Sequence, residues 1–327
     1  MRLPRALSLT LFLLVIIKGC HGAASNPGVD PVLSGQVTLH FTCGTASVSL
    51  ERQASASLMR VGEQTYPMNE VPSASGARLE AVDDASTWLH EKSGEALVAI
   101  AGRQLAACRV AQPPGTPFAA RGQEPGWHLV VADDRIELTA DYGERRIDLP
   151  LEATEQDGAA TRFRAAHGEQ LTVTVTATAG ICRDSMSGMP HPYAVTARLG
   201  DERLDGCGGE PLDLLAGHGW AVEYLDGSGL EDRSRITLTF LPEDGRVVGT
   251  GSCNRYSAGF TLTGEGLALG PVAATKMACA PPVMQQESRF FAILERVYRF
   301  DVDATGALTL ISPEATMIAY PDLAADE

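Results

Sequence analysis

The sequence predicts a mainly β protein made of three small antiparallel β domains, the last of which carries one α-helix. Apolar and polar residues alternate along many short segments, which is typical of strands with one wet face. Two turn-rich breaks divide these segments into three groups, and each group contains one tryptophan and two cysteines. A chain of 327 residues is also long enough for two or three domains, at roughly 100–200 residues each.

The strands are expected in order along the three groups. The clearest alternating segments are 37–43, 46–50, 127–131, 171–175 and 236–240. One helix is expected at about Val283 to Tyr298, directly after Pro281 and Pro282, which suit a helix start. Its Phe290, Leu294 and Val297 would lie on one apolar stripe and face the core.

The breaks lie at residues 111–117 and near residues 208–211, where proline and glycine are concentrated. We therefore expect domains at residues 36–110, 111–213 and 214–327. Residues 21–35 are small, polar and rich in turn-forming residues, which suits a linker ahead of the first domain.

The composition excludes several classes of protein. Hydrophobic residues make up 44% and charged residues 20%, so the chain is neither disordered nor a polytopic membrane protein. The formal net charge is −15 at pH 7, and so acidic a surface repels phosphate backbones. We expect no nucleic-acid partner, and we expect a basic protein to be attracted instead.

The N-terminus has the features of an export signal. Arg2 and Arg5 form a basic start, and residues 6–17 are an apolar run too short to span a bilayer as a helix. The run leads into Ile17-Lys18-Gly19-Cys20, which resembles a bacterial lipobox despite the lysine. The prediction is a signal peptide at residues 1–20 and lipid attachment at Cys20.

Lipid on Cys20 would anchor the chain to a membrane without a transmembrane span. His21 stands where an inner-membrane retention signal would have aspartate, so we expect an outer-membrane lipoprotein that faces the periplasm. The alternative is ordinary cleavage near Ala23-Ala24, which would discard Cys20 and leave a soluble periplasmic protein.

Six cysteines remain on either route, and an oxidising periplasm favours disulfides between them. They are Cys43, Cys108, Cys182, Cys207, Cys253 and Cys279. Many connectivities are possible, and we choose sequential pairing (43–108, 182–207 and 253–279) because it places one bridge in each segment. A metal site is the alternative, but the sequence has no CxxC motif and its histidines are scattered. We expect no metal and no cofactor.

The sequence lacks the common catalytic motifs. It has no G-x-S-x-G elbow, no P-loop and no H-E-x-x-H motif. The stretch Asp184-Ser185-Met186-Ser187-Gly188 places two hydroxyls near an acid, but no base accompanies them, so we expect a tight capping turn. The prediction is that the protein is not an enzyme.

Segment 36–110 contains several motifs in a fixed order. They are FTCG at 41–44, SASGAR at 73–78, Trp88, KSGEA at 92–96 and the closing Cys108. This order resembles the membrane-bound lysozyme inhibitor family, MliC. The resemblance implies a small antiparallel β-barrel with a disulfide, which blocks the sugar cleft of c-type lysozyme with a loop serine and a nearby lysine.

On this chain, the resemblance places that serine at Ser75 and the lysine at Lys92, with Ser73, Gly76 and Ala77 as further contacts. A lysozyme cleaves glycan between two carboxyl groups, one kept protonated and the other ionised. A hydroxyl can bond one of them and an ammonium can pair with the other. The small residues beside Ser75 give a thin backbone that can enter a groove.

Two features depart from the family's pattern. Leu79 stands where an aromatic residue is usual, and Lys92 lies four positions after Trp88, whereas the family's lysine lies two positions after its tryptophan. Either two residues are inserted, or His90 takes the place of the lysine. We favour Lys92, because its spacing to Glu95-Ala96 is the family's. Trp88 is expected in the core.

The other two segments also carry family-like strings. FAARGQEPGW at 118–127, CRDSMSG at 182–188 and GC at 206–207 resemble an uncharacterised family of envelope lipoproteins. GTGSCNRY at 249–256, TKMAC at 275–279 and Glu287 resemble the META domain of HslJ-type envelope proteins. We expect Asn254 to be a turn residue and Glu287 to be a helix-surface or capping charge.

Together these features predict an envelope-anchored inhibitor of c-type lysozyme that acts by inserting a loop into the catalytic cleft. One alternative is a non-enzymatic envelope-stress or structural lipoprotein without potent inhibition. A second alternative is a carrier that holds a small ligand in a barrel cavity.

Overall fold

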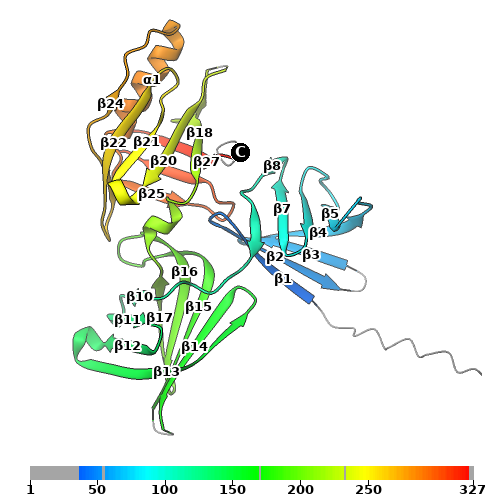
Figure 1. The fold of residues 1–327 in the computed structure, drawn as a ribbon, viewed down its shortest axis with the longest axis vertical. Coiled ribbons are helices and arrows are strands. Elements are labelled where there is room, and N and C mark those ends of the chain that lie inside the picture. Colours follow the sequence, from blue (N-terminus) through cyan, green and yellow to red (C-terminus); the bar gives the residue numbers. More distant parts are fainter. Residues whose placement is uncertain (1–36, 54–55, 169–170, 232, 324–327) are drawn as a thin grey trace, which may run out of the picture. The chain divides into compact units, whose positions relative to one another are not determined.

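The computed structural model describes residues 37–53, 56–168, 171–231 and 233–323. Three antiparallel sheets follow one another along the chain (Figure 1). The first two are closed barrels and the third is nearly closed, with the single α-helix beside it. The predicted fold class is therefore confirmed. The signal peptide at 1–20, Cys20 and the linker at 21–35 lie outside the described residues.

The first barrel is formed by short strands in an almost sequential order. They are β1 (Val37–Cys43), β2 (Ala46–Gln53), β3 (Ala56–Val61), β4 (Gln64–Val71), β5 (Ala77–Ala81), β6 (Trp88–Lys92), β7 (Glu95–Ile100), β8 (Arg103–Gln104) and β9 (Cys108–Val110). Pairing of β7 with both β6 and β9, and of β9 with β1, closes the sheet. Alternate residues such as Leu50, Leu79 and Leu89 point inward and are fully buried, as period-2 patterning requires.

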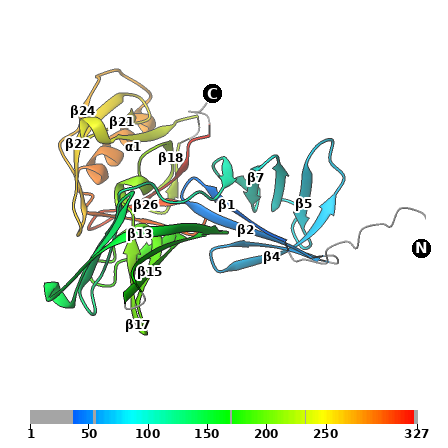
Figure 2. The same cartoon turned by 60° about the horizontal axis from the view of Figure 1, so that its bottom comes forward.

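The second barrel contains the longest strands. They are β10 (Phe118–Gly122), β11 (Trp127–Val131), β12 (Arg135–Ala140), β13 (Arg145–Asp157), β14 (Ala160–His167), β15 (Leu171–Arg183), β16 (Pro190–Leu199) and β17 (Glu202–Gly208). Each strand pairs with the next, and β10 pairs with β17 to close the barrel. Figure 2 labels β13, β15 and β17, which are alternate strands of this barrel. Phe118, Trp127 and Phe163 are buried in its core, together with aliphatic side chains.

The third sheet packs against the helix. Its strands are β18 (Gly219–Leu225), β19 (Ser228–Gly229), β20 (Ile236–Leu241), β21 (Arg246–Thr250), β22 (Arg255–Leu262), β23 (Leu267–Leu269), β24 (Ala273–Ala274), β25 (Arg299–Val302), β26 (Leu308–Ile311) and β27 (Thr316–Pro321). Helix α1 (Pro281–Leu294) buries Phe290 and Leu294 in a core that also holds Trp220 and Phe240. Figure 1 shows α1 beside β21 and β22.

The helix is shorter than predicted at its C-terminal end. It begins at Pro281, with both prolines in its first turn, and ends at Leu294 instead of near Tyr298. The chain after Leu294 tightens into turns, in which the Arg296 and Val297 amides bond the carbonyls of Ile293 and Leu294. Val297 remains buried, so the apolar stripe exists although the last part of it is not helical.

The three predicted disulfides are confirmed. Cys43 lies opposite Cys108 on β1 and β9, and Cys182 joins β15 to Cys207 on β17. Cys253, between β21 and β22, pairs with Cys279 just before α1. Each bridge therefore ties together two segments of one sheet or its helix. The chain-entropy model assigns about 3.5 kcal/mol to each of the two shorter loops and about 4.3 kcal/mol to the loop closed by Cys43–Cys108.

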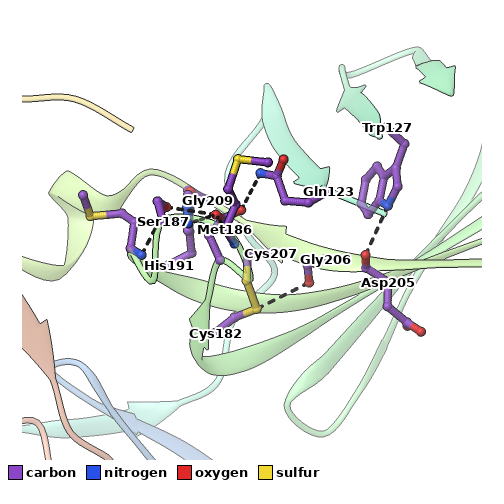
Figure 3. Close-up of a disulfide and its surroundings, with 12 residues drawn as sticks. Gln123, Trp127, Cys182, Met186, Ser187, His191, Asp205, Gly206, Cys207 and Gly209 are labelled. Carbon is purple, nitrogen blue, oxygen red and sulfur yellow. Dashed lines mark hydrogen bonds between the residues drawn. A yellow bond between two sulfur atoms is a disulfide. The ribbon is translucent and has the colours of Figure 1, made fainter. Parts of the chain in front are cut away.

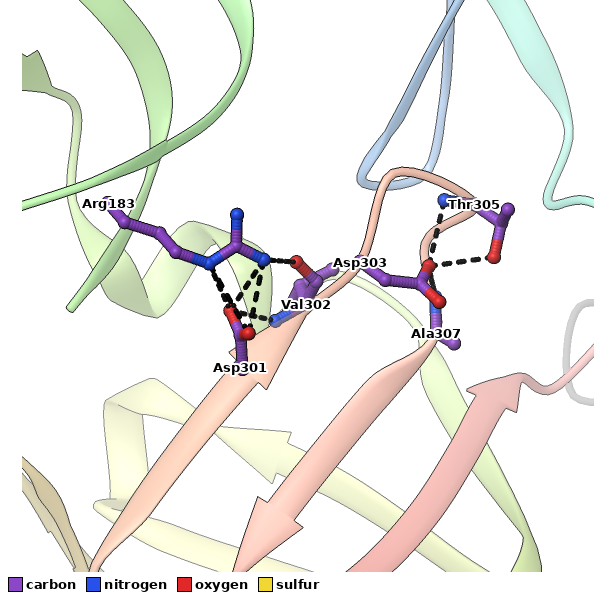
Figure 4. A network of polar contacts seen from close by, with 6 residues as sticks. All are labelled: Arg183, Asp301, Val302, Asp303, Thr305 and Ala307. Atoms are coloured by element: carbon purple, nitrogen blue, oxygen red, sulfur yellow. Dashed lines mark hydrogen bonds and ion pairs between the residues drawn. The ribbon is translucent and has the colours of Figure 1, made fainter. Parts of the chain in front are cut away.

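Two aspartates organise the start of the β25–β26 hairpin (Figure 4). Asp303 accepts hydrogen bonds from the amides of Thr305 and Ala307 and from the Thr305 hydroxyl, which shapes the turn. Asp301 pairs with Arg183 from the end of β15, and the Arg183 guanidinium also donates to the Val302 carbonyl at 3.0 Å. Both aspartates thus have structural partners.

Candidate functional site

The loop between β4 and β5 presents the predicted inhibitory serines. Residues 72–76 of this loop are exposed. The Ser73 hydroxyl donates to the carbonyls of Ser75 and Gly76, at 2.8 and 3.0 Å, so it folds the loop upon itself. The Ser75 hydroxyl forms no hydrogen bond with any described residue. Of the two serines, Ser75 is therefore the one whose hydroxyl is available to a partner.

Gly76 allows the loop to approach strand β6. Its φ is +68°, a conformation that glycine adopts without strain. A Cβ at this position would lie 2.3 Å from the Glu91 carbonyl oxygen and 3.0 Å from the Cβ of Lys92. Any side chain would collide there, so glycine is what places the loop directly beside the end of β6.

Strand β6 carries the cationic side of the site. Leu89 points into the core, so Trp88, His90 and Lys92 alternate onto the outer face. In the register of the hairpin, His90 lies opposite Arg78 and Leu89 lies opposite Leu79. The spacing of four between Trp88 and Lys92 is even, and it therefore keeps both residues on one face of the strand.

His90 holds the serine loop by a cross-strand hydrogen bond. Its Nε2 lies 2.7 Å from the Ser75 carbonyl oxygen. A carbonyl oxygen can only accept, so Nε2 carries the proton and donates it. The neutral and the charged imidazole can both make this bond. His90 thus fixes the backbone of Ser75, a role that sequence analysis missed because it depends on strand register.

Lys92 ends β6 at a tight turn. Ser93 and Gly94, which follow it, both have positive φ, as in a two-residue type I′ hairpin turn. Lys92 is exposed and forms no hydrogen bond or ion pair within the described part of the chain. The structure therefore brings Ser75, Gly76, His90 and Lys92 together on one side of the first barrel, with Ala77 half-buried at the start of β5.

The sequence predicts Trp88 in the core, but the structure places it outside the core. It is half-buried on the outer face, where the Arg78 guanidinium lies 4.5 Å from the centre of its ring. The inward positions of these two strands are taken by Leu79 and Leu89, which leaves no room for an indole. Strand alternation, rather than the size of the side chain, decided its place.

In the second barrel, the two motif strings meet around a buried carboxylate (Figure 3). Asp184 Oδ1 accepts from the amides of Met186 and Ser187 and from the Ser187 hydroxyl, and Gln123 donates to Oδ2 at 2.7 Å. Burial alone would raise the pKa of Asp184, but these hydrogen bonds outweigh it and lower the pKa to about 2. The stretch is the capping turn that the sequence predicted.

The third sheet contains a buried carboxylate, which corrects the prediction for Glu287. This residue is 4% exposed and accepts from the amides of Cys253 and Asn254 and from the Asn254 side chain. Asn254 Oδ1 in turn accepts from the Thr275 hydroxyl and the Met277 amide. Glu287 is therefore a buried hydrogen-bond acceptor that joins α1 to two loops, and it is not a helix-surface charge.

Within the described ranges, no group of histidine, cysteine or acidic side chains is arranged to hold a metal ion. No described helix is long and apolar enough to cross a membrane.

The sequence of the first barrel was then compared with known families. Residues 39–106 match the family described as membrane-bound lysozyme-inhibitor of c-type lysozyme. The first barrel carries the MliC pattern. Residues 213–322, which span the third sheet and its helix, match the META domain. Both resemblances seen in the sequence are thereby confirmed, and the resemblance of the middle segment to an envelope lipoprotein family stays a prediction.

Comparisons with individual proteins add little. No curated protein matches the chain. A protein from Burkholderia xenovorans solved by NMR is 25% identical over 34% of this chain and 85% of its own, with a TM-score of 0.30. Another protein solved by NMR is 24% identical over 32% of this chain and 90% of its own, with a TM-score of 0.28. TM-scores this low carry no argument about the fold.

Proposed function

We propose that the protein is an envelope-anchored inhibitor of c-type lysozyme and that the β4–β5 loop enters the catalytic cleft of the enzyme. The match of residues 39–106 to MliC supports the kind of partner, and the position of the Ser75 loop beside the end of β6, where Lys92 lies, supports the mode of binding. In this proposal the chain catalyses nothing. It protects the cell wall by occupying the site where the glycan would bind.

The mechanism follows from the chemistry of the cleft. A lysozyme uses one carboxyl group that stays protonated and one that is ionised. The Ser75 hydroxyl would hydrogen-bond one of them, and the Lys92 ammonium would pair with the other. A charge-assisted bond in a cleft that excludes water is stronger than a neutral one. Gly76 contributes because the loop needs no space for a side chain at its base.

We call the β4–β5 loop together with Lys92 the wedge. The structure supports Lys92, and not His90, as the cation of this wedge. His90 Nε2 is already used by the Ser75 carbonyl, whereas Lys92 has no partner among the described residues. In this proposal His90 sets the position of the serine and Lys92 supplies the charge.

The lipid anchor remains part of the proposal. Cys20 would carry the lipid, so that the protein faces the periplasm from the outer membrane. A lysozyme that crosses that membrane would then meet the inhibitor before it reaches peptidoglycan. If the chain were instead cleaved near Ala23-Ala24, it would lose Cys20, and the resulting soluble periplasmic protein would serve the same purpose.

Lysis of bacterial cells by a c-type lysozyme tests the proposal directly. The exported chain should protect the cells, and Ser75→Ala and Lys92→Ala should each weaken the protection about tenfold or more, since each removes one polar contact in a dry cleft. Lys276→Ala is the matched control, because Lys276 is an exposed lysine far along the sequence in the META segment. Unprotected cells at micromolar protein would refute the proposal.

Lysine chemistry offers an independent readout. The sequence has three lysines, Lys18, Lys92 and Lys276, and the first lies within the predicted signal peptide. Acetylation followed by mass spectrometry should show Lys92 protected in the presence of lysozyme and Lys276 unprotected. Equal labelling of both lysines in the complex would mean that Lys92 does not enter the interface.

The META match favours a second candidate function. It spans residues 213–322, a longer stretch than the inhibitor match. The chain would then be a non-enzymatic envelope-stress or structural lipoprotein whose first barrel inhibits weakly. Expression of a chain with both Ser75→Ala and Lys92→Ala separates the two, because a structural role would survive the loss of inhibition.

A further inference from the structure

A pocket of about 310 Å³ opens on the outer face of the first barrel, next to Lys92. Strands β6, β7 and β9 form it, and its lining includes His90, Lys92, Glu95, Leu97 and Arg109. It therefore shares His90 and Lys92 with the proposed inhibitory site, whereas Glu95, Leu97 and Arg109 belong to β7 and β9.

The strand register arranges these residues in two rows. Lys92 lies opposite Glu95, and Glu95 lies opposite Arg109, so the two cations stand on either side of one acidic residue. His90 and Leu97 form the neighbouring row. Adjacent strands lie about 4.8 Å apart, which puts the backbones of Lys92 and Arg109 roughly 10 Å apart.

The two cations beside the pocket lack ion pairs, unlike others in the same barrel. Arg60, Arg78 and Arg103 each form an ion pair with a carboxylate. Lys92 and Arg109 are exposed and form none with the described residues, although Glu95 lies between them. Two positive charges are thus held on one face without an internal partner.

Leu97 makes the pocket partly apolar. Its neighbours in sequence, Ala96 and Val98, point inward and are buried, whereas Leu97 is 43% exposed on the outer face. A leucine in the row beside two unpaired cations fits a side chain with an apolar stem and an acidic end. The stem would lie against Leu97, and the carboxylate would meet Lys92 or Arg109.

We propose that this pocket receives an acidic side chain from the rim of the cleft of c-type lysozyme. Contact would then run in both directions, with the wedge of the inhibitor in the cleft and a side chain of the enzyme in the pocket. The inference rests on the proposed function, because continuity with Lys92 is what identifies the partner. It assigns Arg109 and Leu97 as residues that determine affinity.

Affinity measurements with the full exported chain test this assignment. Arg109→Ala and Leu97→Thr should each weaken lysozyme binding by about three- to tenfold, and Arg109→Glu should weaken it further. Two controls match them in type. Val82→Thr replaces another exposed apolar residue, and Arg198→Ala removes an exposed arginine of the second barrel. Both controls should bind as the unaltered chain does.

Substitutions in the enzyme identify the acidic group. Each Asp or Glu at the cleft rim of the lysozyme is changed to its amide and paired with Arg109→Ala in a double-mutant cycle. At least one pair should show a coupling of threefold or more. Absence of coupling at every acidic position, or unaltered affinity in either Arg109→Ala or Leu97→Thr, would overturn the assignment.

The two proposals fail in different ways. If the unaltered chain binds lysozyme and Ser75→Ala and Lys92→Ala weaken it, but the pocket variants do not, only the pocket assignment is wrong. If the unaltered chain does not bind lysozyme at all, the proposed function fails and the pocket loses its partner with it.

Discussion

His90 and Lys92 are two residues apart on one face of β6, yet the fold gives them different surroundings. The imidazole of His90 bonds the Ser75 carbonyl across the strands, and Lys92 has no partner among the described residues. From the sequence, either residue could be the cation of the site. The difference between them arises because Ser75 follows the register of β5 and β6, which fixes which side chain its carbonyl meets.

His90→Ala should weaken inhibition without removing a contact to the enzyme. Loss of one hydrogen bond of about 0.5–1.5 kcal/mol frees the backbone of Ser75 and should raise the inhibition constant roughly two- to tenfold. His90→Gln keeps an N–H donor at a similar distance and should restore most of the affinity. Inhibition constants from turnover of a soluble glycan substrate check this. Equal potency of the alanine variant and the unaltered chain would contradict the positioning role.

The lowered pKa of Asp184 predicts that the second barrel loses stability in acid. Its folded pKa of about 2 lies below the ordinary value of 3.8, so its ionised form stabilises the fold above pH 4. That stabilisation, about 2 kcal/mol from the shift, is lost as the pH falls from about 4 towards 2. Asp184→Asn should therefore be less stable at pH 7 by about that amount, and the gap should narrow in acid.

Hydrogen exchange in peptides from β10 to β17 resolves this effect from the rest of the chain. Asp201→Asn, in an exposed turn, is the control and should leave exchange unaltered. A difference between the Asp184 variant and the unaltered chain that stays constant from pH 7 to pH 2.5 would exclude this explanation.

Elements of the third sheet are joined by a carboxylate that no cation neutralises within the described residues. Glu287 on α1 accepts three N–H groups from the turn that carries Cys253 and Asn254. Asn254 then binds the segment of Thr275 and Met277, which leads into the helix. A single helical residue thus organises both strings that matched the META domain.

Glu287→Gln should destabilise this arrangement by about 1–3 kcal/mol, because the amide can turn a donor toward N–H groups that need an acceptor. Faster hydrogen exchange in peptides that cover 249–256 and 275–280 would show it. Glu314→Gln is the surface control, since that side chain is 76% exposed. Unchanged exchange in the Glu287 variant would mean that the three hydrogen bonds contribute nothing to stability.

At the scale of the whole molecule, charge and proposed partner are matched. The chain carries a net charge of −15, and a basic lysozyme would be attracted to it over a distance of about 10–30 Å in dilute salt. The proposed binding site on the first barrel has the opposite charge. Its two cations, Lys92 and Arg109, have no ion pair with the described residues and would lie beside the acidic cleft of the lysozyme. Long-range attraction therefore brings the proteins together, and local complementarity orients them.

The association rate should therefore depend on salt. Between about 50 mM and 0.5 M sodium chloride, it should fall by on the order of tenfold, while the dissociation rate changes much less. Surface plasmon resonance with immobilised inhibitor measures both rates. An association rate that is constant over this range would show that the net charge does not steer the encounter.

The positions of many strands and the pairing of the six cysteines could be predicted from sequence alone. Strands can be identified from sequence because their period of two is local, as in 127–131 and 236–240. Cysteine pairing could be chosen because each segment holds two cysteines, and Cys43–Cys108, Cys182–Cys207 and Cys253–Cys279 followed. The motif strings of the first and third segments also sufficed to identify their families.

Only the tertiary structure decided which side chains meet across strands. Pairing of β7 with both β6 and β9 brought Lys92 near Arg109, and the register of β5 and β6 brought His90 onto the Ser75 carbonyl. The outward turn of Trp88 and the burial of Glu287 likewise depend on neighbours distant in sequence. Local patterns encode periodicity and turns, but register and burial are set by contacts among segments that no single stretch of sequence contains.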